Sequence, residues 1–291
     1  MRQAYLIMAH NNIEILKKCI ELIDDYDNEI FIHIDKKSYN ISKNSLDKVC
    51  RLSKIHFIER LDIRWGDFSQ VQCEINLLKE AYKGNFDYYH LISGVDLPIK
   101  TQDEIKNFLD KNLGKEFVHF CDKEETEMYK IRSNRYYYTK LLRGKYSNLN
   151  KALNKILIII QNIIKYEKNK GLNIKKGSNW FSITHKLVNV ILENEEWINK
   201  CFKNTLCPDE HFLQTLIYKE KLEENLYKFY LEGDISNSLR EIDWKKGDPY
   251  IYTENDFNLL INSNNIFARK FDKVKDFNIV NLIYDYLKNF D

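Results

Sequence analysis

The feature that most constrains this chain is an alternation of strand-like and helix-like segments through its first 120 residues. An apolar run at 4–9 is followed by an amphipathic stretch at 13–23 and by a second β-rich run at 29–35. Apolar residues at helical spacing between two short apolar runs indicate strand, helix, strand. Parallel strands need such a crossover, so the order predicts a βαβ unit.

The same alternation continues through two further rounds. Strand patterns at 54–59, 86–93 and 115–120 are separated by helical patterns at 68–82 and 101–112. Thr101 and Glu104 have the spacing of a capping box at the start of the second of these helices. We therefore predict an α/β fold with a Rossmann-like, mostly parallel central sheet flanked by helices.

The remainder of the chain is more irregular, yet it contains no repeat, low-complexity linker or shift in composition. We predict one domain spanning 1–291, with a nucleotide-binding half at 1–120 and an acceptor-binding and catalytic half at 121–291. Ligands of open α/β sheets bind outside the carboxyl ends of the strands. The residues predicted at those ends are His10, Asp35, Ser93, Gly94 and Asp96.

Two of the candidates on this edge have an alternative, purely structural interpretation. Asp35 follows a strand, where an aspartate either contacts a nucleotide or caps the next helix. Trp65 lies in the loop before a helix, where it is either a platform for stacking a base or a loop anchor. Gly94 allows a close backbone approach, and Asp96 offers a polar contact.

In the second half, the segment CPDEHF places two carboxylates at a predicted helix start. Pro208 suits the first helical position, and Asp209 and Glu210 lie in the first turn. They are either partners of the helix dipole or, for Glu210, a general base held beside a pocket.

Several cations of this half are candidates for holding an anionic group. Arg240, Lys245 and Lys246 lie close in sequence, and Arg269 and Lys270 follow an aromatic-rich helix. Such cations either gather to hold a diphosphate or form a solvated face. The basic, aromatic segment around Arg132, Arg135 and Tyr136 is likewise either an acceptor site or a solvated face.

Composition excludes several functions. The chain has 45 Lys and Arg against 43 Asp and Glu, so it lacks the basic excess of a nucleic-acid binder. The six cysteines form no CxxC pair, and the N-terminal apolar run is short for a signal peptide, so we expect a cytoplasmic protein with reduced thiols.

Metal and membrane contacts can also be assessed from the sequence. The one Asp-x-Asp triplet, at 25–27, precedes a predicted strand and so lies at the amino end of the sheet; we expect no metal site. No run reaches the length of a membrane span. The apolar helix pattern KILIIIQNII, flanked by lysines, is typical of a core or self-association helix, and peripheral contact with a membrane stays open.

Eight segments in order resemble the core-2/I-branching β-1,6-N-acetylglucosaminyltransferase and peptide O-xylosyltransferase family, glycosyltransferase family 14. They are AYLIMAH, IFIHIDKKS, the WG-x-x-S-x-V-x-x-E segment at 65–74, YYHLISGVDLPIKT, GSNWFSIT, CPDEHFLQT, LREIDW and IFARKFD. The resemblance implies an A-type glycosyltransferase fold, a UDP-sugar donor, a glycan acceptor, inversion at the anomeric carbon and no cofactor or metal.

The resemblance also implies roles for individual residues. Glu210 resembles the family's general base, and Lys270 matches the lysine that contacts the donor phosphates. Asp35 and the backbone near Met8 match uridine contacts, Trp65 falls where an aromatic ring packs on the uracil, and His10 lies beside them. Trp244 and Arg240 in LREIDW resemble residues near the acceptor and the donor, respectively, and we expect Trp180 at the acceptor as well.

The chain departs from the animal members at one cation. Their upstream arginine falls near Gly247 here, so Lys246, Lys245 or Arg240 would have to replace it. High Lys, Asn and Ile usage suggests an AT-rich bacterial genome and a role in surface polysaccharide synthesis. The sugar remains open among N-acetylglucosamine, xylose, glucose and galactose. The alternatives are a metal-dependent or retaining transferase of another family and an inactive carbohydrate- or nucleotide-binding relative.

Overall fold

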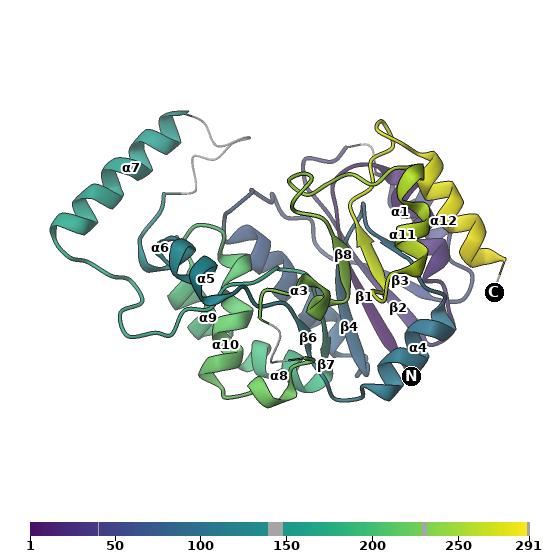
Figure 1. Cartoon of the computed structure of the whole chain (residues 1–291), viewed down its shortest axis with the longest axis horizontal. Helices are drawn as coiled ribbons and strands as arrows, with labels where there is room; N and C mark the ends of the chain where they lie inside the picture. Colours follow the sequence, from purple (N-terminus) through teal and green to yellow (C-terminus); the bar gives the residue numbers. More distant parts are fainter. Residues whose placement is uncertain (40, 139–147, 229–231, 290–291) are drawn as a thin grey trace.

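The computed structural model describes residues 1–39, 41–138, 148–228 and 232–289. Its centre is a six-stranded sheet with the strand order β3-β2-β1-β4-β7-β6 (Figure 1). These strands are β1 (Gln3–Ala9), β2 (Asn28–Ile34), β3 (Lys54–Phe57), β4 (Tyr88–Ser93), β6 (Phe117–Val118) and β7 (Phe181–Thr184).

The first four strands are parallel, as the alternation predicts. Helices cover both faces of this sheet, which is why the strands are almost continuously apolar. In β1, Tyr5 and Ile7 pack into one hydrophobic cluster, while Ala4 and Leu6 pack into the other. The alternation of side chains along a single strand thus supplies both cores.

Each face of the sheet is covered by its own set of helices, contributed by both halves of the chain. On the Tyr5 face lie α1 (Ile13–Leu22), α4 (Gln102–Lys111), α11 (Phe257–Asn262) and α12 (Asn278–Lys288). On the opposite face lie α3 (Ser69–Tyr82), α8 (His185–Glu193), α9 (Glu195–Phe202) and α10 (Phe212–Lys219). The predicted capping box at Thr101 and Glu104 is present at the start of α4.

The second half of the chain enters the main sheet. Strand β7 pairs antiparallel with both β4 and β6, so the sheet is mixed at this edge. A smaller sheet, β5-β9-β8, joins β5 (Leu97–Pro98) to β8 (Arg240–Ile242) and β9 (Phe267–Arg269). Both sheets therefore contain strands from either side of residue 120, and the two predicted halves share one structure.

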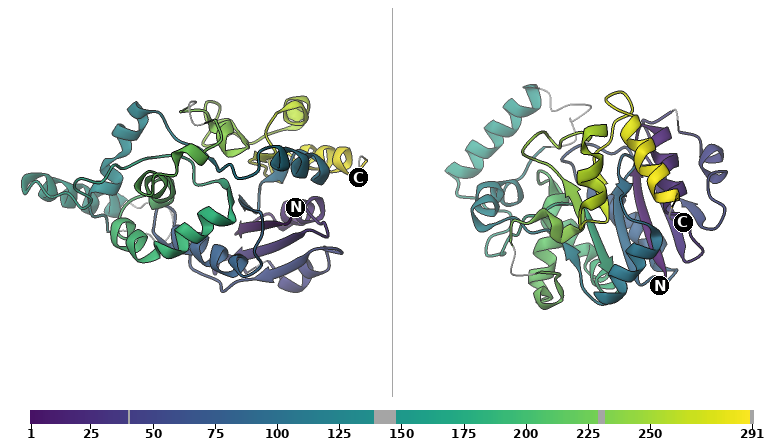
Figure 2. Two further views of the ribbon diagram at one scale, coloured as in Figure 1. Left: turned by 90° about the horizontal axis from the view of Figure 1, so that it is seen from below. Right: turned by 45° about the vertical axis from the view of Figure 1, so that its right-hand side comes forward.

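The remaining elements connect or project from this body. They are α2 (Lys43–Asp47), α5 (Lys123–Tyr129), α6 (Ile131–Asn134), α7 (Asn148–Ile163) and the 3₁₀ turns η1 (Pro208–Glu210), η2 (Glu223–Asn225), η3 (Ile235–Ser238) and η4 (Glu254–Asp256). Helix α7 lies at the end of the molecule opposite α12 in every view (Figures 1 and 2).

Candidate active site

A cavity of about 940 Å³ opens at the carboxyl ends of β1, β2 and β4. This is the edge that the parallel topology predicts, and the volume is in the range of ligand sites. The segments after β9 and the loop around Trp65 complete its walls. The lining residues are Met8, Ala9, His10, Asn11, Asn12, His33, Asp35, Lys37, Ser38, Ile63, Arg64, Trp65, Gln70, Ser93, Val95, Lys151, Asn179, Trp180, Ile251, Arg269, Lys270, Phe271 and Asp272.

The wall at the strand ends is held by the backbone. The Asp35 N–H donates to the Ala9 carbonyl at 2.9 Å, and the Ser38 hydroxyl donates to the His10 carbonyl at 2.6 Å. His33 Nε2 accepts from the Leu61 N–H at 2.9 Å, and burial lowers the pKa of His33 to about 4. A neutral imidazole therefore fixes the loop beneath the cavity at neutral pH.

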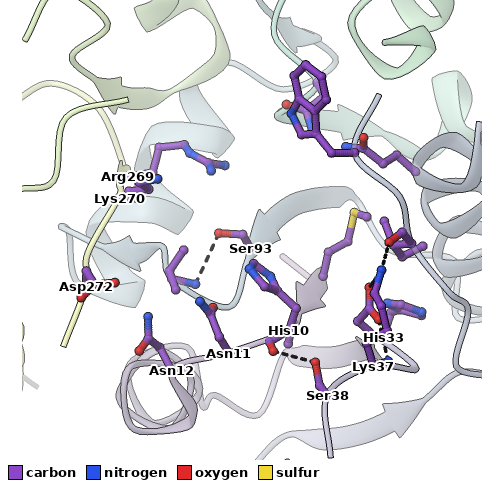
Figure 3. Close-up of a pocket in the computed structure, with 18 of the residues that line it drawn as sticks. His10, Asn11, Asn12, His33, Lys37, Ser38, Ser93, Arg269, Lys270 and Asp272 are labelled. Carbon is purple, nitrogen blue, oxygen red and sulfur yellow. Dashed lines mark hydrogen bonds and ion pairs between the residues drawn. The ribbon is translucent and has the colours of Figure 1, made fainter. Parts of the chain in front are cut away.

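Positive charge dominates the lining, with five lysines and arginines against two aspartates. Arg269 and Lys270 stand on one side, His33 and Lys37 on the other, and His10 and Ser93 lie between them (Figure 3). Burial lowers the pKa of His10; Asp35 opposes this effect, and Lys37, Lys270 and Arg269 lower the pKa further. The cavity is thus suited to an anionic ligand.

Arg269 lines the cavity with a guanidinium group that has unused hydrogen-bond donors. Its guanidinium stacks 4.0 Å from the centre of the Trp180 ring, and Nη1 lies 3.7 Å from an Asp96 oxygen. The Nε and Nη1 groups have no hydrogen-bond partner. Burial lowers the pKa of Arg269, while Asp96 raises it. Buried donors without partners are costly in a folded protein, so an acceptor such as a phosphate would satisfy them.

Other sequence candidates on this side are also placed by the structure. Lys270 lines the cavity beside Arg269, and Trp65 stands at the rim with 68% of its surface exposed. Met8, His10 and Asp35 line the floor, and Asp35 pairs with Lys37 at 3.6 Å.

Glu210 belongs to a separate cluster of charges next to the cavity. Turn η1 begins after Cys207, which has a left-handed backbone conformation, and it ends at Glu210. A Glu210 oxygen lies 3.2 Å from Arg132 Nη1 and 3.6 Å from Lys176 Nζ. Lys176 also bonds to Glu125 at 2.9 Å. The cluster contains two cations and two carboxylates, so its charges are balanced.

Glu210 does not itself line the cavity, but hydrogen bonds connect its turn to segments that do. The Gly177 N–H donates to the Glu210 carbonyl at 2.9 Å, and the same segment continues to Trp180, on which Arg269 stacks. Gln70, which lines the cavity, donates to Asp209 at 3.1 Å. Turn η1 is therefore linked to the cavity wall through Gln70 and through the segment 177–180, and the Glu210 side chain is 32% exposed.

Two buried carboxyl groups, those of Asp209 and Glu74, lie close together beside Glu210, and this pair was not predicted from the sequence. Burial and the charge of Glu210 raise the pKa of Asp209, and burial together with Asp209 raises that of Glu74. One oxygen of Asp209 and both of Glu74 have no hydrogen-bond partner. The two residues are 135 positions apart, and only the WG-x-x-S-x-V-x-x-E and PDE motifs, taken together, signal that both are present.

Gly94 and Asp96 support the cavity from behind. A Cβ on Gly94 would lie 3.1 Å from the Cβ of Ala9, so the close approach is to β1 and not to a ligand. Asp96 accepts from the backbone N–H of Ser93 at 2.8 Å and from its hydroxyl at 2.6 Å. Asp96 thus holds the turn after β4 through Ser93, and its carboxylate also lies next to Arg269.

Arg240, Lys245 and Lys246, the residues expected to replace the second phosphate cation of the animal enzymes, lie outside the cavity. Arg240 is fully buried and donates to the Ser182 hydroxyl at 2.7 Å and the Leu91 carbonyl at 2.8 Å, so it ties the two sheets together. Lys246 is exposed and pairs with Asp243 at 3.5 Å. Neither residue lines the cavity, and Lys245 and the half-exposed Trp244 do not line it either. The cation that lines the cavity next to Lys270 is instead Arg269.

The expected acceptor residues are divided between two places. Arg132 lies in the Glu210 cluster, and Trp180 lines the cavity. Arg135 instead donates to Asn162 of α7 at 3.1 Å, and the Tyr136 N–H donates to Gln161 of α7 at 2.8 Å. These last two residues anchor a helix.

The Asp-x-Asp triplet lies at the amino end of β2, as its position in the sequence predicts. Both carboxylates pair with Lys106, Asp25 at 2.7 Å and Asp27 at 3.2 Å. Across the described ranges, no three His, Cys, Asp or Glu side chains converge in a way that could hold a metal ion. Nor does any helix in those ranges have the length and apolar character needed to cross a membrane.

This fold and cavity define an α/β protein with a cation-lined cavity at the carboxyl edge of a parallel sheet. Comparison with known proteins identifies the family. The Core-2/I-Branching enzyme family model matches residues 3–266, so the chain belongs to this family.

The similar proteins of known activity are animal glycosyltransferases. A Bos taurus β-1,3-galactosyl-O-glycosyl-glycoprotein β-1,6-N-acetylglucosaminyltransferase is 24% identical over 98% of this chain and 69% of its own length. A Mus musculus N-acetyllactosaminide β-1,6-N-acetylglucosaminyl-transferase is 23% identical over 92% of this chain and 68% of its own. Xylosyltransferase 2 of Rattus norvegicus is 20% identical over 84% of this chain, but this match covers 27% of the rat protein.

Among solved structures, the apo form of mouse xyloside xylosyltransferase 1 aligns with a TM-score of 0.40 and 9% identity, covering 91% of this chain and 96% of that one. By its family and relatives, the chain is a glycosyltransferase enzyme.

Proposed function

We propose that this enzyme transfers a sugar, with inversion and without a metal ion, from a UDP-sugar to a hydroxyl of a glycan acceptor. The observation that carries the proposal is the pair Arg269 and Lys270, whose cationic groups line the cavity beside the Glu210 cluster. N-acetylglucosamine is the first sugar to test, because the Bos taurus and Mus musculus relatives are named for its transfer. The alternatives are xylose, glucose and galactose.

In the proposed complex, uridine occupies the strand-end wall between Met8, Asp35 and Trp65. The diphosphate lies against Arg269 and Lys270, where the unsatisfied guanidinium donors would bond to its oxygens. Charge that develops on the leaving UDP is neutralised by these fixed cations. Preorganised charge of this kind is the largest contribution to catalysis in many enzymes.

The acceptor hydroxyl is proposed to lie between Glu210 and the anomeric carbon. Glu210 takes the hydroxyl proton while the acceptor oxygen bonds to that carbon and the bond to the UDP oxygen breaks. Arg132 and Lys176 hold the carboxylate in place through ion pairs at 3.2 and 3.6 Å. Such a base contributes about 10²–10⁴-fold in rate.

The acceptor class is proposed to be a glycan of a bacterial surface polysaccharide. The Lys-, Asn- and Ile-rich composition supports a bacterial origin. Because pocket walls set the choice of sugar, a panel of UDP-sugars tested for thermal stabilisation would identify the donor.

The test is a UDP-release assay with that panel, on the native enzyme and on Glu210→Gln. We expect the variant to bind UDP normally but to lose about 10²–10⁴-fold in turnover. Glu125→Gln is the matched control, since Glu125 bonds to the same lysine without being the proposed base; its turnover should fall less than about tenfold.

Two results would contradict the proposal. An active Glu210→Gln variant would remove the base. Activity that is lost in EDTA and restored by Mn²⁺ would replace the cation pair with a metal ion.

A further inference from the structure

Helix α7 is built with its polar side facing the protein and its apolar side facing solvent. Asn154 and Gln161, which are buried, point inward. Asn154 accepts from the Tyr138 N–H at 2.8 Å, and Gln161 accepts from the Tyr136 N–H at 2.8 Å and donates to the Tyr136 carbonyl at 3.0 Å. The helix is thus attached through side-chain amides, the reverse of a normal surface helix.

The outward side of α7 carries a continuous apolar surface. Its exposed residues are Leu149, Leu153, Ile156, Leu157, Ile159, Ile160 and Ile163, with Ile164 directly after the helix. At about 100° per residue these side chains span about 160° of the helix circumference. Eight large exposed apolar residues on one short segment form a patch that monomeric proteins rarely leave uncovered. Of the two sequence-based alternatives, the core helix is therefore wrong, and the self-association helix stays a prediction.

The charged residues within 148–166 are all lysines. Lys151 and Lys155 are exposed on the helix edge between the apolar and the inward-facing arcs, and Lys165 follows the helix. Residues 148–166 contain no aspartate or glutamate. Two copies packed through this face would bring their lysines together. An anionic surface would instead attract the lysines while the isoleucines enter an apolar layer.

From this geometry we infer that α7 lies in the interface of an anionic lipid membrane, with its apolar face among the acyl chains and its lysines at the phosphate level. An amphipathic helix with lysines beside a broad apolar face is the arrangement known to bind in this way. Helix α7 stands at one end of the molecule, where a flat surface can reach it without meeting the sheets (Figures 1 and 2).

The position of Lys151 gives the inference a functional consequence. Lys151 lies on α7 and also lines the cavity, so docking through α7 would bring one wall of the cavity close to the lipid surface. Together with the proposed function, this arrangement favours an acceptor glycan that is presented at a membrane. Membrane binding itself does not depend on the proposed function.

The test is flotation of the purified full chain with vesicles of phosphatidylcholine alone or mixed with phosphatidylglycerol. We expect binding to the anionic vesicles that weakens as salt rises, because exposed charges are screened. Ile156→Glu with Ile160→Glu should lower the bound fraction about tenfold or more. The control Leu282→Glu changes an apolar residue of α12 that is 41% exposed, against 55% for Ile156 and 49% for Ile160, and should leave the bound fraction unchanged.

Three results would overturn the inference. They are flotation with neither kind of vesicle, flotation that the double variant leaves unchanged, and a dimer in sedimentation that the double variant dissociates in the absence of lipid binding. Circular dichroism of the double variant should match that of the native chain, because both isoleucines are exposed. UDP release with water-soluble acceptors should also be unchanged, so failure of the membrane inference is separable from failure of the proposed activity.

Discussion

The cation pair at Arg269 and Lys270 and the Glu210 cluster are neighbours, yet their charges are arranged in opposite ways. Arg269 keeps two buried donors without hydrogen-bond partners. In the Glu210 cluster, Arg132 and Lys176 are already paired with Glu210 and Glu125. In the proposed complex the diphosphate would satisfy the free donors of the first region, whereas the cations of the second are already paired within the protein. A ligand site can therefore be distinguished from a positioning site by which donors remain unsatisfied.

This comparison predicts that mutations at the cation pair change the affinity for UDP, whereas mutations in the Glu210 cluster change the free energy of unfolding. Arg269→Ala should weaken UDP binding about 100-fold, since a charge-assisted contact contributes about 1.5–3 kcal/mol. Titration calorimetry measures this directly. Lys246→Ala is the control, because Lys246 is exposed and lies outside the cavity; equal losses in both variants would show that net charge alone holds UDP.

In the Glu210 cluster the expected loss is in stability. Lys176→Met removes a mostly buried cation from two carboxylates and should lower the free energy of unfolding by about 2 kcal/mol. Lys37→Met removes a cation that is 58% exposed, and its cost should stay below about 1 kcal/mol. Urea unfolding of both variants decides between these values. If the order is reversed, the cluster is not held by its ion pairs.

The pH dependence of stability should have opposite signs at His33, in the strand-end wall of the cavity, and at Asp209, beside Glu210. His33 has a pKa of about 4 when folded and 6.5 when unfolded, so the unfolded chain binds more protons and stability falls as pH drops from 6.5 to 4. Asp209 has a raised pKa, so the folded chain binds more protons and stability falls as pH rises above 3.8.

Each slope is at most about 1.4 kcal/mol per pH unit. His33→Gln, which keeps an acceptor for Leu61, should flatten the acidic side of the profile. Asp209→Asn should flatten the other side. Thermal unfolding from pH 4 to pH 8 provides the measurement, and a variant that shifts the whole profile without changing its slope would contradict the assignment.

The sequence was sufficient for the part of the site that depends on strand order. Met8, His10 and Asp35 line the cavity because parallel strands place their carboxyl ends along one edge. Arg240 was misplaced, because the sequence does not show that Ser182 and the Leu91 carbonyl surround it. For Arg269 the sequence left two alternatives, a cation that holds a diphosphate or a solvated surface residue, and its stacking on Trp180 in the cavity wall excludes the second.

The fold, like the site, has features that local sequence patterns predict and others that they do not. Periodicity predicted the parallel strands and their helices, since these are local patterns that match the burial on both faces. It could not predict that β7 enters between β4 and β6, because that pairing joins segments more than 60 residues apart. The orientation of α7 was also hidden, since an apolar period does not say which side meets the protein.

The place of β7 has a consequence for attempts to recombine this enzyme. Since β7 separates β4 from β6, a fragment ending at residue 120 would leave two strands with unpaired backbone edges, which are prone to associate with other chains. Chimaeras between relatives should therefore be joined after Thr184, where the main sheet is complete. An exchange of the strand-end wall of the cavity should therefore carry β1 through β7 together, and Arg269 and Lys270 would still come from the other parent.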